Sequence, residues 1–206
     1  MLIGLVGLIG SGKGTVGDML VEQDFMHESF ASSLKDAAAG VFNWDRELLE
    51  GITPASRAWR EGVDEWWGDR LGIPDFTPRL ALQLLGTDVF RNHFHQDIWI
   101  LGLESRIKDS NNNIVLTDAR FPNEIDMVRR LGGVIVRVKR GDDPAWFNFA
   151  ATQPENMFQV HPDIHASEYS WVGVTPNYLI TNDGTMEDLT TVVKDLLEDL
   201  LGSTPI

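Results

Sequence analysis

The feature that most constrains this chain is a glycine-rich loop close to its start. An apolar run at residues 2–6 is followed at once by nine residues, GLIGSGKGT, of which four are glycine. Glycine loses more backbone freedom on folding than any other residue, so this density needs a physical reason. The loop fits the first seven positions of the pattern G-x-x-x-x-G-K-[ST], which wraps a phosphate group between a strand and a helix.

The chemistry of the loop predicts contacts with the phosphates of a nucleotide. Without side chains in the way, successive backbone N–H groups can point inward at an anion, and the N-terminus of the following helix adds partial positive charge. The lysine of the loop supplies a full charge for the β- and γ-phosphates. The expected contacts are Gly7, Gly10, Ser11, Gly12, Lys13, Gly14 and Thr15. A plain glycine-rich turn is the alternative, but strand, spacing, lysine and helix all favour phosphate binding.

One position departs from the common pattern. Gly14 stands where most such loops have a Ser or Thr whose hydroxyl ligates Mg²⁺, and the next hydroxyl is that of Thr15. The form GKGT resembles the loops of adenylate kinase and some other nucleoside monophosphate kinases. That resemblance implies that water and the nucleotide hold most of the Mg²⁺ and that Thr15 contacts the α-phosphate. Direct ligation of Mg²⁺ by the loop stays open.

Composition limits the classes of partner. The chain has 206 residues, enough for one α/β domain or one domain with an inserted subdomain. Its net charge of −14 argues against a nucleic-acid polymer, because polyphosphate binding depends on clustered Lys and Arg. With no cysteine, neither disulfides nor thiolate chemistry is expected. The N-terminal run lacks a basic segment and no stretch is long enough to span a bilayer, so we expect a soluble cytoplasmic protein with no membrane partner.

The apolar pattern predicts an α/β fold with a parallel sheet. Strands are expected at residues 2–6, 25–30, 114–117, 133–139 and 178–181. Helices are expected at 15–22, 123–131 and 186–201, and most of 32–108 should be helical, with breaks near Pro54, residues 72–74 and Pro78. Residues 140–176 show no regular pattern. Strands that alternate with helices form parallel sheets through right-handed crossovers.

A second group of polar residues follows the expected strand at 114–117. Asp118 comes directly after it, at the edge where α/β sheets bind ligands, and is a candidate to hold a metal ion. An Asp before a helix is as often an N-cap, and the sequence does not decide between the two. Arg120 should face the same cleft, where its planar guanidinium can bind a phosphate through two hydrogen bonds. An ion pair of Arg120 with Glu124 is the alternative.

Seven segments stand out together: GLIGSGKGT, SFASSLK, TPRLALQLLGTDVFR, DIWI, DARFPNE, HASE and NDGTMEDL. Their combination, over about residues 3–195, resembles the phage-type deoxynucleoside monophosphate kinases. The resemblance implies a three-layer P-loop fold that uses ATP and Mg²⁺ to phosphorylate deoxynucleoside 5′-monophosphates (dNMPs) to the diphosphates. It also implies one kinase domain over residues 1–206, with a core at 1–31, 110–139 and 177–206, a helical acceptor-binding region at 32–109 and a lid-like segment at 140–176.

The resemblance also assigns roles to residues. A helix at 78–94 lines the acceptor pocket, and its polar residues lie close to one face at helical spacing. The implied acceptor contacts are Lys35, Arg79, Gln83, Thr87, Arg91 and Arg120, the implied metal ligand is Asp118, and Lys13 and Arg120 act as catalytic cations. By residue type alone, Lys35 is instead a solvated surface lysine.

The lid-like segment is unusual in its charge. Enzymes of this class close a lid whose arginines neutralise developing charge, yet residues 141–176 contain no Lys or Arg. Arg140, just before them, is therefore the candidate lid-side catalytic cation. His161, His165 and Glu168 fall in the segment without matching a zinc pattern, and we assign no metal ligand there.

A last loop follows the expected strand at 178–181. By the same resemblance, Asn182 and Gly184 lie against the adenine of ATP. A simple turn is the alternative, with Thr185 as the N-cap and Asp188 at the third helical position, and the two are compatible.

Several functions stay open at the level of sequence. Another small-molecule P-loop kinase, of dephospho-coenzyme A or phosphomevalonate, would use the same loop. A module that binds nucleotide as a signal without transferring phosphate is compatible with the arginine-poor lid, whereas a structural protein with an inert loop is disfavoured by two polar groups at one sheet edge. The accepted bases stay open, as does the oligomeric state, for which a homodimer is one option.

Overall fold

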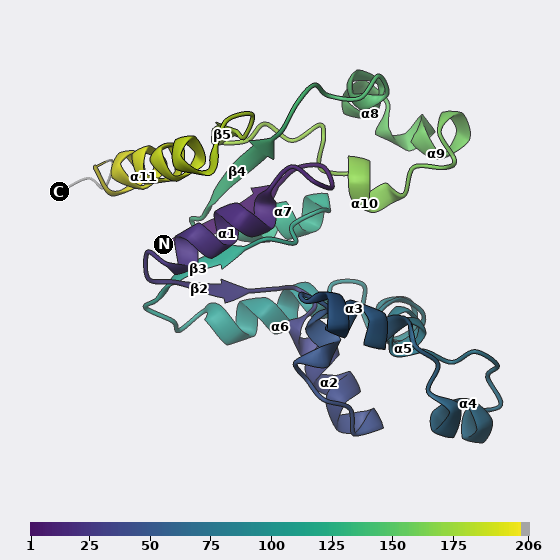
Figure 1. Ribbon diagram of the computed structural model, residues 1–206. Helices are drawn as coiled ribbons and strands as arrows, with labels where there is room; N and C mark the ends of the chain where they lie inside the picture. The colour runs from purple at the N-terminus through teal and green to yellow at the C-terminus, as the bar shows by residue number, and fades with distance from the viewer. Residues whose placement is uncertain (203–206) are drawn as a thin grey trace. The chain divides into compact units, whose positions relative to one another are not determined.

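The computed structural model describes residues 1–202, which form two compact units (Figure 1). Unit 1 combines Met1–Ser29 with the chain from Ser110 onward, and unit 2 is Phe30–Asp109.

Unit 1 is built on a five-stranded sheet in which all neighbouring strands are parallel. All five residues of the central strand β1 are buried, as expected where helices cover both faces of a parallel sheet. The strands lie in the order β2-β3-β1-β4-β5, with bounds β1 Leu2–Val6, β2 Phe25–Glu28, β3 Asn113–Leu116, β4 Val134–Lys139 and β5 Tyr178–Thr181.

Helices on both faces of the sheet give unit 1 three layers. Side chains of α1 and α11 share one core with Ile3 and Leu5 of β1. Gly4 points to the opposite face, because side chains alternate along a strand, and there it lies against Val128 of α7. The bounds are α1 Lys13–Val21, α7 Pro122–Arg130 and α11 Met186–Gly202. The expected fold class, a three-layer α/β fold around a parallel sheet, is confirmed.

The regular elements of unit 2, all of whose residues the structure describes, are helices separated by loops, as expected. Its core is aromatic: the ring of Phe42 stacks on Trp44 with centroids 4.3 Å apart and meets Trp67 edge-on at 5.1 Å. The elements are α2 Ser32–Phe42, η1 Leu48–Glu50, α3 Pro54–Glu61, α4 Glu65–Leu71, α5 Pro78–Gln83, η2 Leu84–Phe94 and α6 Ile98–Ile107.

Two of the three predicted breaks in unit 2, at Pro54 and Pro78, are helix starts, and the third follows the end of α4 at Gly72. Thr53 and Thr77 each precede a proline at the first helical position and accept a hydrogen bond from a backbone N–H of the first turn, 3.1 Å from Ser56 and 3.0 Å from Leu80. A hydroxyl at the N-cap accepts a hydrogen bond from a first-turn N–H that has no partner within the helix. Proline is tolerated at the first helical position because the N–H that it lacks would have no partner there. This pairing explains why the sequence located these boundaries.

Two expectations about elements are wrong. The helix expected over 78–94 is α-helical only to Gln83. The following η2 is a π-helix, in which the N–H of His95 bonds the carbonyl of Phe90 at 2.8 Å. The segment 140–176 is not wholly irregular: it contains short helices, α8 Phe147–Thr152, η3 Pro154–Asn156, α9 Met157–Val160 and α10 Ala166–Tyr169.

Candidate functional site

The glycine-rich loop lies at the carboxyl end of β1 and runs directly into α1. Two of its glycines cannot be replaced without a clash. A Cβ on Gly7 would lie 2.3 Å from the carbonyl oxygen of Val138, and one on Gly12, whose φ is +99°, would lie 2.3 Å from Nδ2 of Asn182. These positions need glycine both for the space and, at Gly12, for the left-handed backbone.

Lys13, the first residue of α1, folds its side chain back over the loop. Its Nζ donates hydrogen bonds to the carbonyl oxygens of Gly7 at 2.6 Å and Leu8 at 2.9 Å. Burial, and then the nearby Arg120 cation, lower the pKa of Lys13 from 10.5 to about 8, while Glu168 partly opposes this shift. The ammonium is thus held inside the loop at an electrostatic cost that an anion would relieve.

The loop after β5 braces the glycine-rich loop. Asn182 Nδ2 donates to the carbonyl of Ser11 at 3.0 Å, and the backbone N–H of Asn182 bonds the carbonyl of Lys139 at 2.7 Å. The N-cap that the sequence predicts at Thr185 is also present, because Thr185 and Asp188 form reciprocal hydrogen bonds at the start of α11. A Cβ on Gly184 would meet Asp188 Oδ2 at 2.6 Å, so Gly184 packs against this cap.

Asp118 follows β3, next to β1 in the sheet, and it does not cap the helix after it. Its Oδ2 accepts a hydrogen bond from Ser29 Oγ at 2.6 Å. The N-cap of α7 is Phe121, and the buried carboxylate of Glu124 accepts from the backbone N–H groups of Arg120 at 2.8 Å and Phe121 at 3.1 Å. The N-cap interpretation of Asp118 is therefore wrong.

The side chain of Arg120 pairs with the lid-like segment and not with Glu124. Its Nη1 lies 3.1 Å from Glu168 Oε1 and donates a longer bond, 3.4 Å, to Ser167 Oγ. The second oxygen of Glu168 accepts the backbone N–H of Ile9, within the glycine-rich loop, at 3.3 Å. Neither contact follows from the sequence, in which HASE was one motif without an assigned role.

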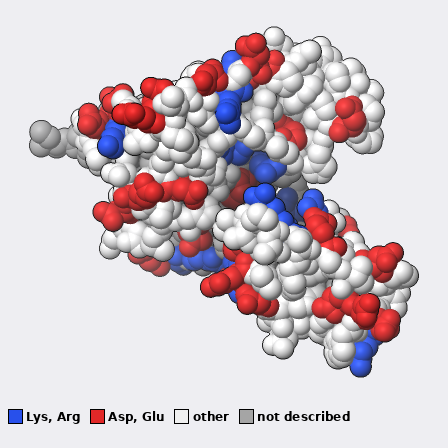
Figure 2. Space-filling model, viewed as in Figure 1, with Lys and Arg blue, Asp and Glu red and all other residues white. Residues whose placement is uncertain are grey.

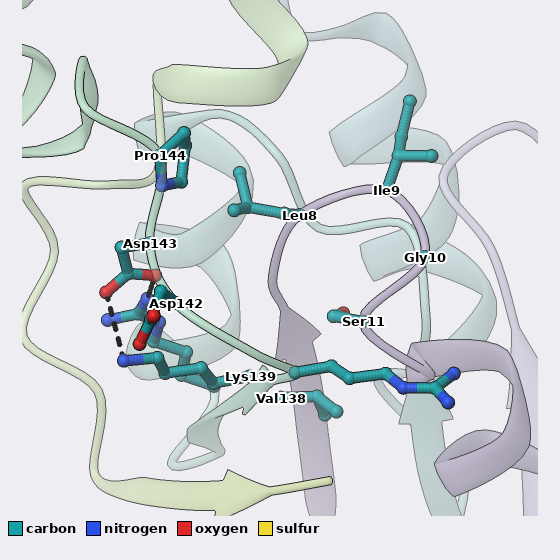
Figure 3. Close-up of a pocket in the computed structure, with 11 residues that line it drawn as sticks. Leu8, Ile9, Gly10, Ser11, Val138, Lys139, Asp142, Asp143 and Pro144 are labelled. Carbon is teal, nitrogen blue, oxygen red and sulfur yellow. Dashed lines mark hydrogen bonds and ion pairs between the residues drawn. The ribbon is translucent and has the colours of Figure 1, made fainter. Parts of the chain in front are cut away.

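A cavity of about 280 Å³ lies beside the glycine-rich loop (Figure 3). Residues 8–11 form one wall, and the end of β4 with the following residues, up to Pro144, forms the other. Arg140 lines this cavity, is exposed and has no ion pair among the described residues. It is therefore available to a ligand that enters here.

Arg137 also lines the cavity, and it has no role in the predictions made from the sequence. Its guanidinium pairs with Asp143, which also lies 3.4 Å from Lys139, and stands 4.4 Å from the ring centre of Phe147. The same guanidinium lies 5.5 Å from the ring centre of Trp171. A cation over aromatic faces in a partly buried site is stabilising, so Arg137 ties the lid-like segment to β4. The aromatic-rich composition of that segment was the available signal.

The expected acceptor contacts other than Arg120 lie in unit 2. Lys35 is not a solvated surface lysine: its side chain is 13 % exposed and its Nζ lies 2.5 Å from Glu50 Oε2. Arg79 is exposed and pairs with Glu61 at 2.7 Å.

The other three residues of this group do not share one α-helical face. Gln83 and Thr87 are exposed and Arg91 is half-buried, but Gln83 ends α5 while Thr87 and Arg91 belong to the π-helix η2. A π-helix bonds each residue to the fifth one along, so residues four apart no longer complete a turn. The expected single line of polar residues is wrong beyond Gln83.

The histidines of the lid-like segment have structural contacts. His165 Nδ1 accepts the N–H of Ser167 at 3.2 Å as the N-cap of α10, and the ring of His161 meets Phe149 edge-on at 5.9 Å. Among residues 1–202, no group of three or more His, Asp or Glu side chains is arranged to hold a metal ion. Within the same residues, no helix combines the length and the apolar character needed to cross a membrane.

Comparison with known proteins finds one family model, several related sequences and several similar folds. Residues 73–193 match the family model "Deoxynucleotide monophosphate kinase". A putative deoxynucleotide monophosphate kinase of Acanthamoeba polyphaga mimivirus is 31 % identical over 68 % of this chain and 74 % of its own length. The deoxynucleoside-5′-monophosphate kinase of Escherichia phage T5 is 28 % identical over 63 % of this chain and 72 % of its own. Among solved structures, a dephospho-CoA kinase from Campylobacter jejuni superposes with a TM-score of 0.48 at 15 % identity, covering 97 % of this chain and 96 % of its own.

Proposed function

Because this chain belongs to the deoxynucleotide monophosphate kinase family, we propose that it transfers the γ-phosphoryl group of ATP to a dNMP and releases ADP and the diphosphate. The observation that carries the proposal is the closed glycine-rich loop around Lys13, on the same sheet edge as Asp118 and Arg120. A kinase of dephospho-coenzyme A or phosphomevalonate is disfavoured, because the family match, over residues 73–193, contains the whole of the acceptor-region segment 78–94.

The proposed chemistry needs no covalent intermediate on the protein. An oxygen of the acceptor phosphate attacks the γ-phosphorus as the bond to the β-phosphate oxygen breaks, and the acceptor oxygen is already an anion, so no strong base is needed. The protein positions both phosphates and neutralises charge. Lys13, Arg120 and Arg140 supply that positive charge in our proposal, with the backbone N–H groups of residues 7–15 around the ATP phosphates.

Mg²⁺ is part of this proposal, and the residues present fit it. Asp118 offers a carboxylate beside the loop, and its partner Ser29 offers a hydroxyl. Mg²⁺ in kinases is usually held by one or two carboxylates together with substrate phosphates and water. Asp118 would hold the ion, which when bound neutralises charge on the β- and γ-phosphates.

The remaining roles are proposed on the same basis. Residues 182–184 contact the adenine, and the acceptor is bound by Lys35, Arg79, Gln83, Thr87, Arg91 and Arg120. In this proposal residues 1–206 are one kinase domain, with the core at 1–31, 110–139 and 177–206, the acceptor region at 32–109 and the lid at 140–176. The enzyme acts in the cytoplasm on small nucleotides, with no nucleic-acid polymer as partner and with a homodimer as one option.

A coupled assay of ADP release tests the function. We expect ADP only when ATP, Mg²⁺ and a dNMP are all present, and Lys13→Ala should remove the activity, because the lysine charge counts most in the transition state. Each of the four common dNMPs, the matching ribonucleotides and dephospho-coenzyme A should be offered separately. Activity on dephospho-coenzyme A alone, or wild-type turnover by a Lys13→Ala protein that is folded by circular dichroism, would contradict the proposal.

A further inference from the structure

Glu168 links two parts of the site, and the proposed function gives it no role. It lies in the one-turn helix α10, and its side chain is only 18 % exposed. One carboxylate oxygen accepts from Arg120 Nη1 at 3.1 Å, and the other accepts from the backbone N–H of Ile9 at 3.3 Å.

The partners of Glu168 are groups that the proposed function reserves for phosphate. Ile9 belongs to the glycine-rich loop, and Arg120 is one of the proposed cations that neutralise phosphate charge and bind the acceptor. Lys13 is also close enough that the Glu168 carboxylate acts to raise its pKa, against the larger lowering effects of burial and of Arg120. A carboxylate presents two acceptor oxygens to such donors, as one edge of a phosphate group does.

We propose that Glu168 is a determinant of nucleotide affinity, because its carboxylate occupies an anion position at the glycine-rich loop and must leave before a polyphosphate binds there. The inference rests on the proposed use of this loop for ATP. Like charges in contact repel strongly in a partly buried site, so Glu168 and the triphosphate compete for the Ile9 N–H, for Arg120 and for the field of Lys13. Each nucleotide that binds must first displace this internal anion.

The structure around Glu168 allows such a displacement at low cost. α10 has four residues, Ala166–Tyr169, and a helix of one turn has little stability of its own. Its contact with Arg120 beyond Glu168 is the 3.4 Å bond to Ser167 Oγ. A change in the conformation of the Glu168 side chain is enough to free the loop, while Tyr169 of the same turn stays buried.

A second interpretation predicts the opposite result. If Glu168 served to orient Arg120 for catalysis, removal of its charge would leave Arg120 less well placed and would weaken the binding of phosphates. Under our proposal the same change removes a competitor and strengthens binding. The sign of the change in affinity therefore separates the two.

The test is a calorimetric titration of the full chain with ATP and, separately, with inorganic tripolyphosphate, without acceptor. We expect Glu168→Gln to bind both ligands roughly five- to tenfold more tightly than wild type, from the loss of hydrogen bonds to a charged group. Asp163→Asn is the matched control, because it removes the same charge from an exposed position of the same segment, and its affinity should stay at the wild-type value. Glu168→Ala is the second variant and should also bind more tightly.

Equal or weaker binding by folded Glu168→Gln and Glu168→Ala would overturn the proposal. So would an equal gain in Asp163→Asn, because it would show a general charge effect. The proposed function is judged by a different measurement, the transfer of phosphate to a dNMP. A wild type that binds ATP but phosphorylates no dNMP contradicts the kinase assignment, and the affinity difference between wild type and Glu168→Gln is still measured. An active kinase without that affinity difference contradicts only the role of Glu168.

Discussion

Lys13 is the single residue whose charge state most directly reports on the site. Its pKa of about 8 lies below the ordinary 10.5, mainly because of burial and then because of Arg120. A bound triphosphate favours the ammonium and raises this pKa. The contribution of the Lys13 ammonium to triphosphate affinity is therefore fully present below pH 8. It is lost as the pH rises from 8 toward the higher pKa that Lys13 has in the complex.

We predict that ATP binding at pH 8 takes up about half a proton, because Lys13 is half-protonated at its pKa. Calorimetry in Tris and in HEPES measures this, since the two buffers release protons with different heats. Lys13→Arg is the control, because an arginine stays charged in both states. The same binding heat in both buffers for the wild type would contradict the predicted uptake.

Arg120 is the residue where geometry matters more than charge. Its guanidinium already uses one nitrogen for Glu168 and Ser167, and a lysine cannot reproduce the planar set of donors. We expect Arg120→Lys to raise the KM for the dNMP by about tenfold, with a smaller change for ATP, given the strength of bidentate charged hydrogen bonds. Steady-state kinetics with each substrate varied in turn gives both constants. An unchanged KM for the dNMP would remove Arg120 from the acceptor site.

At the level of elements, the turn between α7 and β4 depends on a glycine with no room for a side chain. A Cβ on Gly133 would lie 2.8 Å from the backbone oxygens of both Leu2 and Val128. Backbone atoms of the central strand and of a packed helix cannot shift as a side chain can, so the strain would fall on the joint between the two layers.

We therefore predict that Gly133→Ala lowers the free energy of unfolding by about 2 kcal/mol, the usual scale for overpacking. Gly40→Ala is the matched control: Gly40 lies within α2, is exposed and has nothing within 4 Å of a built Cβ. There alanine should be neutral or stabilise by about 0.5 kcal/mol through its higher helix propensity. Urea titrations followed by circular dichroism give both values, and a Gly133→Ala midpoint equal to wild type would contradict the argument.

For the whole molecule, charge sets the class of partner. The net charge is −14, from 31 acidic and 17 basic residues, and acidic side chains are spread over the face shown in Figure 2. Several of the cations are already paired, among them Lys35 with Glu50 and Arg137 with Asp143. Such a surface repels a polyanion at long range while single cations at the site still attract a small nucleotide.

We expect no saturable binding of a labelled DNA duplex at physiological ionic strength, because counterion release needs several Lys or Arg side chains on the phosphates. Fluorescence anisotropy measures this, with ATP binding by the same preparation as the positive control. Saturable binding that weakens with added salt would show a basic surface that the net charge conceals.

The sequence by itself determined the features that depend on residues close together in the chain. The apolar runs located all five strands of the sheet, and the spacing in GLIGSGKGT located the loop between β1 and α1. The Thr-Pro pairs located helix starts, because an N-cap and the first helical position are neighbours. Local rules suffice for these features because a strand, a turn or a cap is formed by a few consecutive residues.

Tertiary structure alone decided which distant groups meet. The bond between Ile9 and Glu168 joins residues 159 positions apart, and nothing in either neighbourhood of the sequence selects the other. The π-helix η2 begins at Leu84, and its third residue, Gly86, is buried close to Leu34 and accepts a hydrogen bond from Trp99 through its carbonyl. Contacts of this kind depend on residues that are distant in the chain, so the one helix that the resemblance implied over 78–94 is two elements in the fold. The contacts of Glu168 and Arg137 could not be predicted for the same reason. The sequence shows that each side chain is charged, but only the fold shows which distant groups lie next to it.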